Sequence, residues 1–298
     1  MTFVFTPFGK RADDGALACD GLVDGAAIDL SHWAGNATPR EWKADTSVEI
    51  AMNFAAANSH AEIARRTVTN NHFDTDGVLA VWTLLEPARA EAHRDALLAA
   101  AEVGDFDEWP ADERGLKLDA ALGILAQRAA GSDARKYERV LPAIAPLLDA
   151  LDAREDLWGA AMRATREERE KAERGALRVI SVGRVTVLQH AVGTAEFAGP
   201  VLFAMAPRDA TRWLLAFEER DGRFAYRYER RRWAWADTVE RPRMSPPSRN
   251  ALARAVGAAD WAVKGELGMT GLLRTKGTIA QGPEEVAGAL ERAESARA

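Results

Sequence analysis

The sequence predicts an α/β protein, with a mostly parallel sheet flanked by helices in a first domain and a smaller α+β domain after it. In the first half, short apolar or β-branched runs alternate with amphipathic helical patterns, as in proteins with a parallel sheet. In the second half, strand patterns and a hairpin signal dominate. Residues 152–174 are rich in charged side chains, most densely in the run TREEREKAERG at 165–175, and predict a solvated connecting helix, so we place the domains at residues 1–176 and 177–298.

Helices of the first domain are predicted from apolar periodicity and from residues that favour helix ends. Residues 45–57 are predicted to form a helix whose N-cap is Asp45 or Thr46. A longer amphipathic helix is predicted over residues 87–103, and we expect Gly104 to end it, because glycine commonly closes a helix.

Strands of the second domain are predicted over residues 179–190 and 201–204. A β-hairpin is predicted from residues 213–219 and 223–229. The Asp-Gly pair at positions 221–222 lies between these strands and favours a type I′ turn.

Composition excludes several classes of protein. The 298 residues are 47% hydrophobic, and we find no apolar run of the ~18 residues that a membrane span needs. The single cysteine, Cys19, excludes an internal disulfide and a multi-cysteine zinc site, and we expect it to be a small core residue. A net charge of −6 argues against a duplex-DNA binder. We expect a cytoplasmic protein without a membrane partner, since the start has no signal-peptide pattern.

The most informative stretch is residues 67–85, TVTNNHFDTDGVLAVWTLL. A β-branched run leads into a crowded polar loop, Gly77 is expected to permit a tight turn, and an apolar helix follows. Strand, loop and helix in this order form the usual ligand-binding edge of an α/β fold. The polar side chains of this loop are those of Asn70, Asn71, His72, Asp74, Thr75 and Asp76.

His72, Asp74 and Asp76 alternate along the loop, so an extended backbone would direct all three to one side. One imidazole and two carboxylates form a hard N/O ligand set that suits Mn²⁺ or Mg²⁺, with Zn²⁺ and Fe²⁺ as further options. Hydrolases use such ions to activate water and to stabilise a charged transition state.

The string TNNHFDTDGVLA resembles the first motif of the DHH phosphoesterases, in which a strand is followed by D-x-D-G and a helix. The resemblance implies an enzyme that hydrolyses phosphodiester or phosphoanhydride bonds with a manganese pair. It implies that His72, Asp74 and Asp76 are metal ligands. The chain has no Asp-His-His triplet, and its nearest equivalent is Asp29 with His32 in IDLSHWAGN, which precedes the first motif as in a permuted relative.

The combination of SHWAGNATP, ADTSVEIA and TNNHFDTDG also resembles a bacterial family of uncharacterised proteins. This second resemblance spans much of the first domain and implies no activity.

We therefore expect the strand ends at residues 28–32 and 67–76 to converge at the carboxyl edge of the sheet and to face the cleft between the domains. The metal ligands would be His72, Asp74, Asp76 and Asp29. The catalytic residues would be Asp74, Asp76 and His32. The predicted reaction is hydrolysis of a phosphate ester or anhydride.

Substrate contacts are assigned to Asn70 and Asn71 of the motif and to Arg227 and Arg231 of the arginine- and aromatic-rich hairpin region. The substrate would be a phosphorylated small molecule or a short oligonucleotide. In the alternative interpretation of the hairpin, its aromatic face packs on the core and its arginines lie in water.

Two further functions stay open. The string FDTDGVL resembles the nucleophile motif of the haloacid dehalogenase superfamily, which implies that Asp74 is a phosphorylated nucleophile and Asp76 an acid/base. A non-catalytic binding protein would instead have its pocket filled by Trp33 or Trp109. In the structural alternative, Asp76 only caps the following helix.

Asp105 and Asp107 are weaker candidates, because acidic residues are ordinary in a loop after a helix. His60, His93 and His190 lie within helical or strand patterns, and we expect them to be structural or surface residues.

Overall fold

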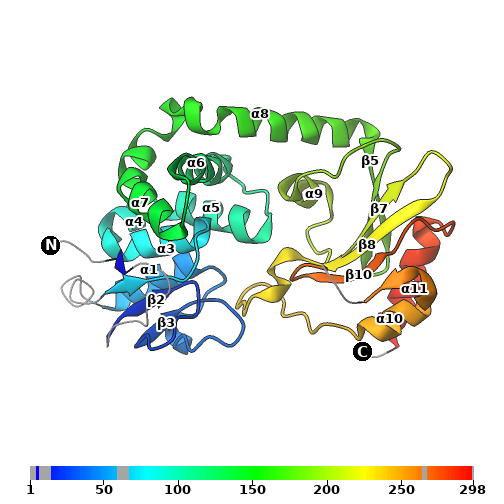
Figure 1. The fold of residues 1–298 in the computed structure, drawn as a ribbon, viewed down its shortest axis with the longest axis horizontal. Helices are drawn as coiled ribbons and strands as arrows, with labels where there is room; N and C mark the ends of the chain where they lie inside the picture. Colours follow the sequence, from blue (N-terminus) through cyan, green and yellow to red (C-terminus); the bar gives the residue numbers. More distant parts are fainter. Residues whose placement is uncertain (1–4, 7–14, 59–66, 264–266, 297–298) are drawn as a thin grey trace. The chain divides into compact units, whose positions relative to one another are not determined.

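The computed structural model describes residues 5–6, 15–58, 67–263 and 267–296 (Figure 1). The chain divides into two compact units, and each unit comprises two separate stretches of the sequence. The first unit comprises Met1–Arg163 and Ala236–Arg243, and the second comprises Ala164–Trp235 and Met244–Ala298. The division lies inside the charged helix α8 (Glu155–Lys171), earlier than the boundary expected near residue 176.

The sheet of the first unit is parallel throughout its described strands, as predicted. Its strand order is β1-β4-β2-β3, and each neighbouring pair is parallel. The strands are very short: β1 (Phe5–Thr6), β2 (Leu17–Cys19), β3 (Ile28–Leu30) and β4 (Val68–Thr69).

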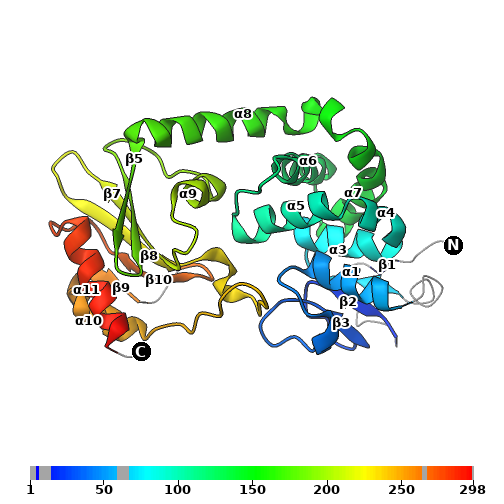
Figure 2. The same cartoon turned by 180° about the vertical axis from the view of Figure 1, so that it is seen from behind.

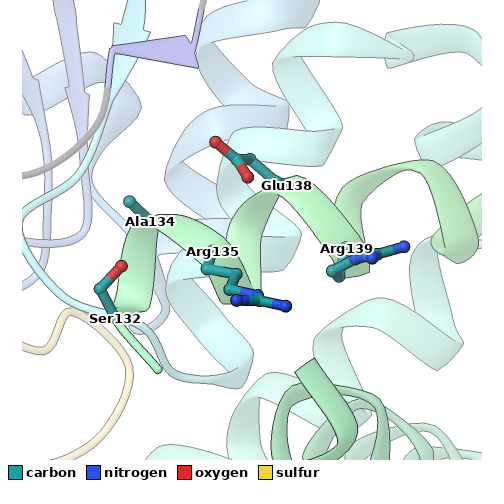
Figure 3. A pocket seen from close by; sticks show the side chains of 5 residues that line it. All are labelled: Ser132, Ala134, Arg135, Glu138 and Arg139. Atoms are coloured by element: carbon teal, nitrogen blue, oxygen red, sulfur yellow. The ribbon is translucent and has the colours of Figure 1, made fainter. Parts of the chain in front are cut away.

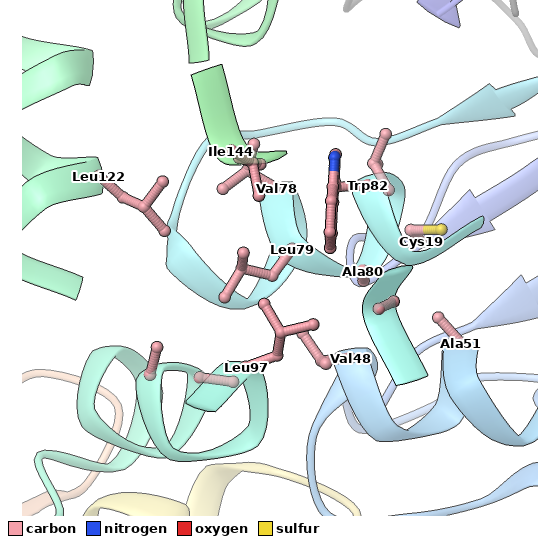
Figure 4. Packing of buried hydrophobic residues seen from close by; sticks show 14 of the residues in the cluster. Cys19, Val48, Ala51, Val78, Leu79, Ala80, Trp82, Leu97, Leu122 and Ile144 are labelled. Atoms are coloured by element: carbon pink, nitrogen blue, oxygen red, sulfur yellow. The ribbon is translucent and has the colours of Figure 1, made fainter. Parts of the chain in front are cut away.

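Helix α3 (Thr75–Leu85) is the centre of the first hydrophobic core, and every residue from Thr75 to Leu84 is buried. Figure 4 shows its apolar side chains, among them Leu79, packing with Leu97 and Ile144 from other helices and lying near Cys19. Cys19 is a buried free thiol, as expected. The described residues of this unit also form α1 (Ser47–Ala57), α4 (Pro87–Ala92), α5 (Arg94–Phe106), α6 (Arg114–Ala129), α7 (Asp133–Asp149) and the first part of α8.

The start of helix α1 agrees with the sequence prediction, whereas the helix predicted over residues 87–103 does not. Helix α1 begins where expected, and the Thr46 hydroxyl accepts a bond from Glu49 N at 3.3 Å. The single helix predicted over residues 87–103 is wrong, because the chain forms α4 and α5 with a break at His93. Gly104 lies inside α5, where a Cβ would come within 3.0 Å of Thr75 Cβ, so close helix packing explains this glycine.

The second unit has a mixed six-stranded sheet of order β5-β6-β7-β8-β10-β9, in which only the β6–β7 pair is parallel (Figure 2). This agrees with the predicted α+β class. Its strands are β5 (Leu177–Val182), β6 (Val185–His190), β7 (Arg212–Glu218), β8 (Phe224–Arg230), β9 (Trp261–Ala262) and β10 (Gly271–Thr275). Its α-helices are α9 (Gly199–Met205), α10 (Arg249–Ala255) and α11 (Pro283–Ser295).

Three details of the second unit correct the sequence interpretation. Residues 201–204 lie in helix α9, whose Pro at the first turn favours a helix start. Residues 179–190 form two antiparallel strands. The β7–β8 hairpin is present, but only Gly222 of its Asp-Gly pair has a positive φ, whereas a type I′ turn needs two such residues.

None of the described helices combines the length and the apolar character needed to cross a bilayer.

Candidate metal centre

Three parallel strands deliver polar residues to one edge of the first sheet. Asp20 follows β2 directly, in a left-handed conformation with φ of 63°. His32 follows β3 by two residues, and the polar loop of residues 70–76 follows β4. Because the carboxyl ends of parallel strands meet at one edge, these side chains converge, as the sequence predicts for residues 28–32 and 67–76. Asp105, from the last turn of α5, joins them.

The buried part of this cluster surrounds the His32 imidazole. His32 Nε2 lies 3.1 Å from Asp105 Oδ2, 3.4 Å from Asp20 Oδ1 and 3.7 Å from Asp76 Oδ2. All four side chains are buried. One imidazole therefore faces three carboxylates in a buried part of the protein.

The outer part of the cluster surrounds the His72 imidazole. His72 Nε2 lies 2.7 Å from Asp74 Oδ2 and 2.9 Å from Asp20 Oδ2. The side chains of His72 and Asp74 are 26% and 38% exposed, so this part is open to solvent. Asp20 belongs to both parts, because Oδ1 faces His32 and Oδ2 faces His72.

Both imidazoles are held by the same kind of contact. His32 Nδ1 lies 2.7 Å from the Asp45 carbonyl, and His72 Nδ1 lies 2.8 Å from Asn71 Oδ1. Each partner can only accept, so each Nδ1 carries the proton and donates. Nε2 then faces the carboxylates, which is the arrangement in which histidine binds a metal in proteins.

The carboxylates are fixed by helix starts. Both oxygens of Asp76 accept backbone amides of the first turn of α1, from Ser47 at 2.7 Å and Val48 at 2.8 Å. Asp74 caps α3 by accepting Gly77 N at 2.8 Å, so the expectation that Asp76 caps this helix is wrong. Gly77 is helical and forms no turn. It leaves room for close packing, since a Cβ there would come within 3.0 Å of Asp20 Oδ2.

Electrostatics make the cluster unusual. Burial raises the pKa of Asp105 well above its usual range and that of Asp76 to about 7. Burial acts the same way on Asp20, but hydrogen bonds with His32 and His72 hold its pKa below the usual value. Burial opposes the charged form of His72, yet its bonds to Asp20 and Asp74 raise its pKa to about 10. Four carboxylates outnumber two imidazoles, so cations would relieve the excess of negative charge.

These residues fit divalent cations. Ligand atoms of Asp20, His32, Asp76 and Asp105 lie within 4.8 Å of one another, as do those of Asp20, His72 and Asp74. Among the described residues, the buried Asp105 Oδ2 accepts no well-directed hydrogen bond, which leaves a lone pair for a metal. Carboxylate oxygen with one imidazole per group is a ligand set for Mn²⁺, Mg²⁺ or Zn²⁺.

The structure brings together most of the predicted ligands. His72, Asp74 and Asp76 lie in the cluster, and His32 joins it as a buried group with no access to a substrate, which argues against an acid/base role. The structure does not bring Asp29, the fourth predicted ligand, into the cluster. It lies within β3, before the edge, and its Oδ2 accepts Ala37 N at 3.1 Å.

Two members of the cluster, Asp20 and Asp105, are not among the ligands that the sequence predicts. Asp20 follows the apolar run ALAC and is separated from the motif by about fifty residues, although an aspartate at a strand end was a usable signal. Asp105 was noted only as part of an acidic loop, because the last turn of α5 was predicted to have ended before it.

A model of one protein family matches residues 1–293 of the chain, and the description of that family is "Family of unknown function (DUF6687)". The chain belongs to the DUF6687 family. This agrees with the predicted resemblance to an uncharacterised family. Comparison with curated proteins and with solved structures yields no match.

In this DUF6687 chain, Asn70 and Asn71 serve the structure of the loop. Asn70 is buried, accepts Gly21 N at 3.0 Å and donates to Tyr137 Oη at 2.9 Å. Asn71 donates to the Leu22 carbonyl at 2.8 Å and holds His72 with its oxygen. Their polar groups are already used, so the predicted substrate contacts are not supported.

The two arginines assigned to substrate lie in the second unit and have partners there. Arg227 pairs with Glu196 at 3.1 Å and contacts Glu229. Arg231 is 1% exposed and lies over the rings of Phe203, Trp213 and Trp233. The aromatic residues of β8 face inward, as the structural alternative for this hairpin predicts, but its arginines do not simply lie in water, because Arg227 is ion-paired and Arg231 is buried.

The other histidines that the structure describes lie outside the cluster. His93 ends α4, and His190 stacks on Phe197 and Phe217 in the second unit, whereas His60 lies outside the described residues. A hollow at the start of α7 is lined by side chains that are exposed or only partly buried (Figure 3). These side chains belong to Ser132, Ala134, Arg135, Glu138 and Arg139. We therefore place the candidate site at the sheet edge.

Proposed function

We propose that the chain is a divalent-metal-dependent hydrolase of a phosphate ester or anhydride, with a nucleotide or a short oligonucleotide as its substrate. The observation that carries the proposal is the pair of ligand groups joined by Asp20, whose two carboxylate oxygens face one imidazole each. Adjacent cation positions that share a carboxylate are common in enzymes that cleave phosphate esters.

The residues divide into two ligand groups. The outer group is His72, Asp74 and Asp20, and the buried group is Asp20, His32, Asp76 and Asp105. Mn²⁺ or Mg²⁺ suits both groups. When bound, such ions lower the pKa of a water molecule and neutralise charge that develops on the phosphoryl oxygens.

The protein residues have distinct tasks in this proposal. His72 and Asp74 are the partly exposed ligands, so the substrate phosphate approaches from their side. The Trp33 ring lies 5.2 Å from the His72 ring, and its Nε1 donates to Asp20 Oδ1 at 3.1 Å. Trp33 therefore orients Asp20 and offers an apolar surface beside the outer group.

The resemblance of TNNHFDTDGVLA to the first DHH motif supports the same reaction class. The haloacid-dehalogenase alternative is weaker, because Asp74 Oδ1 already accepts the Gly77 amide and Oδ2 already contacts His72. These contacts occupy the oxygens that a nucleophile would need. A non-catalytic binding protein with the same cluster is the alternative that the experiment must address.

The test combines metal analysis with hydrolysis of bis(p-nitrophenyl) phosphate in added Mn²⁺. We expect stoichiometric metal and Mn²⁺-dependent turnover in the wild type, and loss of both in Asp74→Ala. Asp29→Ala is the matched control, since it removes a carboxylate outside the cluster and should change neither. Metal without turnover of any phosphate ester or anhydride would favour the binding protein, and absence of metal would refute the proposed site.

A further inference from the structure

A segment that we call the strap, Ala236–Arg243, packs in the first unit although the chain on both sides of it belongs to the second. Its backbone pairs with the loop that carries His32. Trp33 forms an antiparallel bridge with Ala236, and Asp237 N donates to the His32 carbonyl at 2.7 Å. The strap thus contacts the metal-binding loop directly.

The strap encloses the Asp45 carboxylate. Asp45 accepts the backbone amides of Val239, Glu240 and Arg241, the last two at 2.9 Å, and Arg241 Nη1 at 2.8 Å. Asp45 is 3% exposed. A buried carboxylate with four donors is a rigid anchor, because each bond to a charged group is stronger than a neutral one.

The Arg241 guanidinium extends the anchor to helix α5. Its Nε and Nη2 bind the Glu108 carboxylate at 2.8 and 2.9 Å, and Nη2 also donates to Glu102 Oε1 at 2.7 Å. The guanidinium carbon lies 4.8 Å from the centre of the Phe106 ring. One side chain therefore ties the start of α1 to the end of α5.

These two helix ends hold the buried ligand group. The Asp45 carbonyl accepts His32 Nδ1, and two residues later Ser47 and Val48 donate their amides to Asp76. Asp105 directly precedes Phe106 in the last turn of α5, and the Arg241 guanidinium lies over the Phe106 ring. Among the described residues, Arg241 forms no hydrogen bond or ion pair with the candidate ligands, but its partner Asp45 binds His32 through its carbonyl and precedes the turn of α1 that binds Asp76, and its partners Glu102 and Glu108 flank Asp105 in the sequence.

We propose that Arg241 is a positioning residue that fixes His32, Asp76 and Asp105 and so sets the divalent-cation affinity of the buried ligand group. The inference rests on the proposed function, because it assumes that the cluster binds metal. Loss of a group that orients metal ligands typically lowers affinity about 10–100-fold, and we expect an effect of this size on one of two bound ions.

Whether Arg241→Ala raises or lowers the affinity for Mn²⁺ distinguishes a positioning role of Arg241 from a purely electrostatic one. Removal of a positive charge near a cation site should strengthen cation binding if charge alone matters. Arg241→Ala is expected to weaken Mn²⁺ binding, which only the geometric role explains. Arg241→Lys keeps the charge but loses the two-pronged contact with Glu108, so we expect it to restore affinity in part.

The experiment measures Mn²⁺ binding to the full chain by calorimetry, with thermal melting as a check on folding. Arg243→Ala is the matched control, because Arg243 lies on the same strap, is 70% exposed and pairs only with Asp237 among the described acidic residues. Nitrogen-15 NMR spectra of the Mg²⁺-loaded protein report the tautomer of the His32 imidazole. We expect a single set of His32 resonances, that of the Nδ1–H tautomer, in the wild type. In Arg241→Ala we expect these resonances to broaden or to split. If that variant does not fold, Asp45→Asn tests the same anchor and keeps the backbone carbonyl.

The outcomes distinguish the two proposals. A wild-type chain that binds no Mn²⁺ would refute the metal site and the inference with it. A wild-type chain that binds Mn²⁺, with folded Arg241→Ala or Asp45→Asn binding it equally or more tightly, would overturn the role of Arg241 alone. Weaker binding in these variants, unchanged binding in Arg243→Ala and an altered His32 resonance would support it.

Discussion

Gly77→Ala tests how tightly the loop and helix α3 are packed around the candidate ligands. A Cβ at this position would lie 2.4 Å from Asn70 Nδ2 and 2.9 Å from Asp74 Oδ1. Asn70 cannot move freely, because it bonds Gly21 N, Asn71 N and Tyr137 Oη in a buried site. Loss of these three bonds would cost about 1.5–4.5 kcal/mol.

Alanine also favours a helix over glycine by about 1 kcal/mol, so the net loss in the free energy of unfolding is about 0.5–3.5 kcal/mol. Gly123→Ala is the matched control. Gly123 is an exposed residue of α6, and a Cβ there would meet nothing within 4 Å, so this change should stabilise the chain by up to about 1 kcal/mol. Urea denaturation measures both, and Mn²⁺ titration should show weaker binding only for Gly77→Ala. A Gly77→Ala chain as stable as the wild type would refute the packing argument.

Three further predictions concern charge, core and surface. In the metal-free chain, the folded-state pKa of His72, about 10, exceeds its ordinary value of 6.5. Its charge therefore stabilises the fold fully below pH 6.5, and this contribution is lost as the pH rises through 10. Urea unfolding in chelator should show a steeper loss of stability from pH 7 to 9.5 in the wild type than in His72→Gln, and equal slopes would contradict the predicted pKa. Leu79→Ala removes a fully buried side chain and should lower the free energy of unfolding by about 2–5 kcal/mol. Leu22→Ala, at an exposed site, should change it by less than about 0.5 kcal/mol. Similar losses in the two variants would argue against the placement of Leu79 in the core. Arg227→Ala breaks a partly exposed ion pair and should leave Mn²⁺ affinity unchanged in calorimetry, so a large change would place Arg227 at the metal site.

The fold was predictable where local pattern and tertiary structure agree. Helix α1, the charged helix α8 and the β7–β8 hairpin all follow from periodicity, caps and alternation in their own residues. Errors came from residues whose role is set by distant packing. Gly104 and Gly77 were interpreted as helix-ending or turn-forming glycines, but both sit inside helices where a neighbouring element approaches closely.

The candidate site was predictable only from its contiguous part. His72, Asp74 and Asp76 stand two residues apart, and their spacing alone indicates a shared site. Asp20 and Asp105 come from other elements, and a lone aspartate carries no spacing that marks it as a ligand. Closeness in sequence to His32 favours Asp29 as its partner, but Asp29 lies inside β3, before the edge where the cluster forms.

The strap shows why such a site needs the whole chain. Asp45 and Arg241 are separated by 196 positions, so no local pattern relates them. Yet Asp45 links the strap to His32 through its carbonyl and to the first turn of α1, which binds Asp76. If the buried ligand group depends on this link, a chain that ends before residue 236 will keep all six ligands and still bind Mn²⁺ less tightly. A sequence motif can indicate candidate metal ligands, whereas the contacts that would hold these ligands in place include residues almost two hundred positions away, such as Arg241.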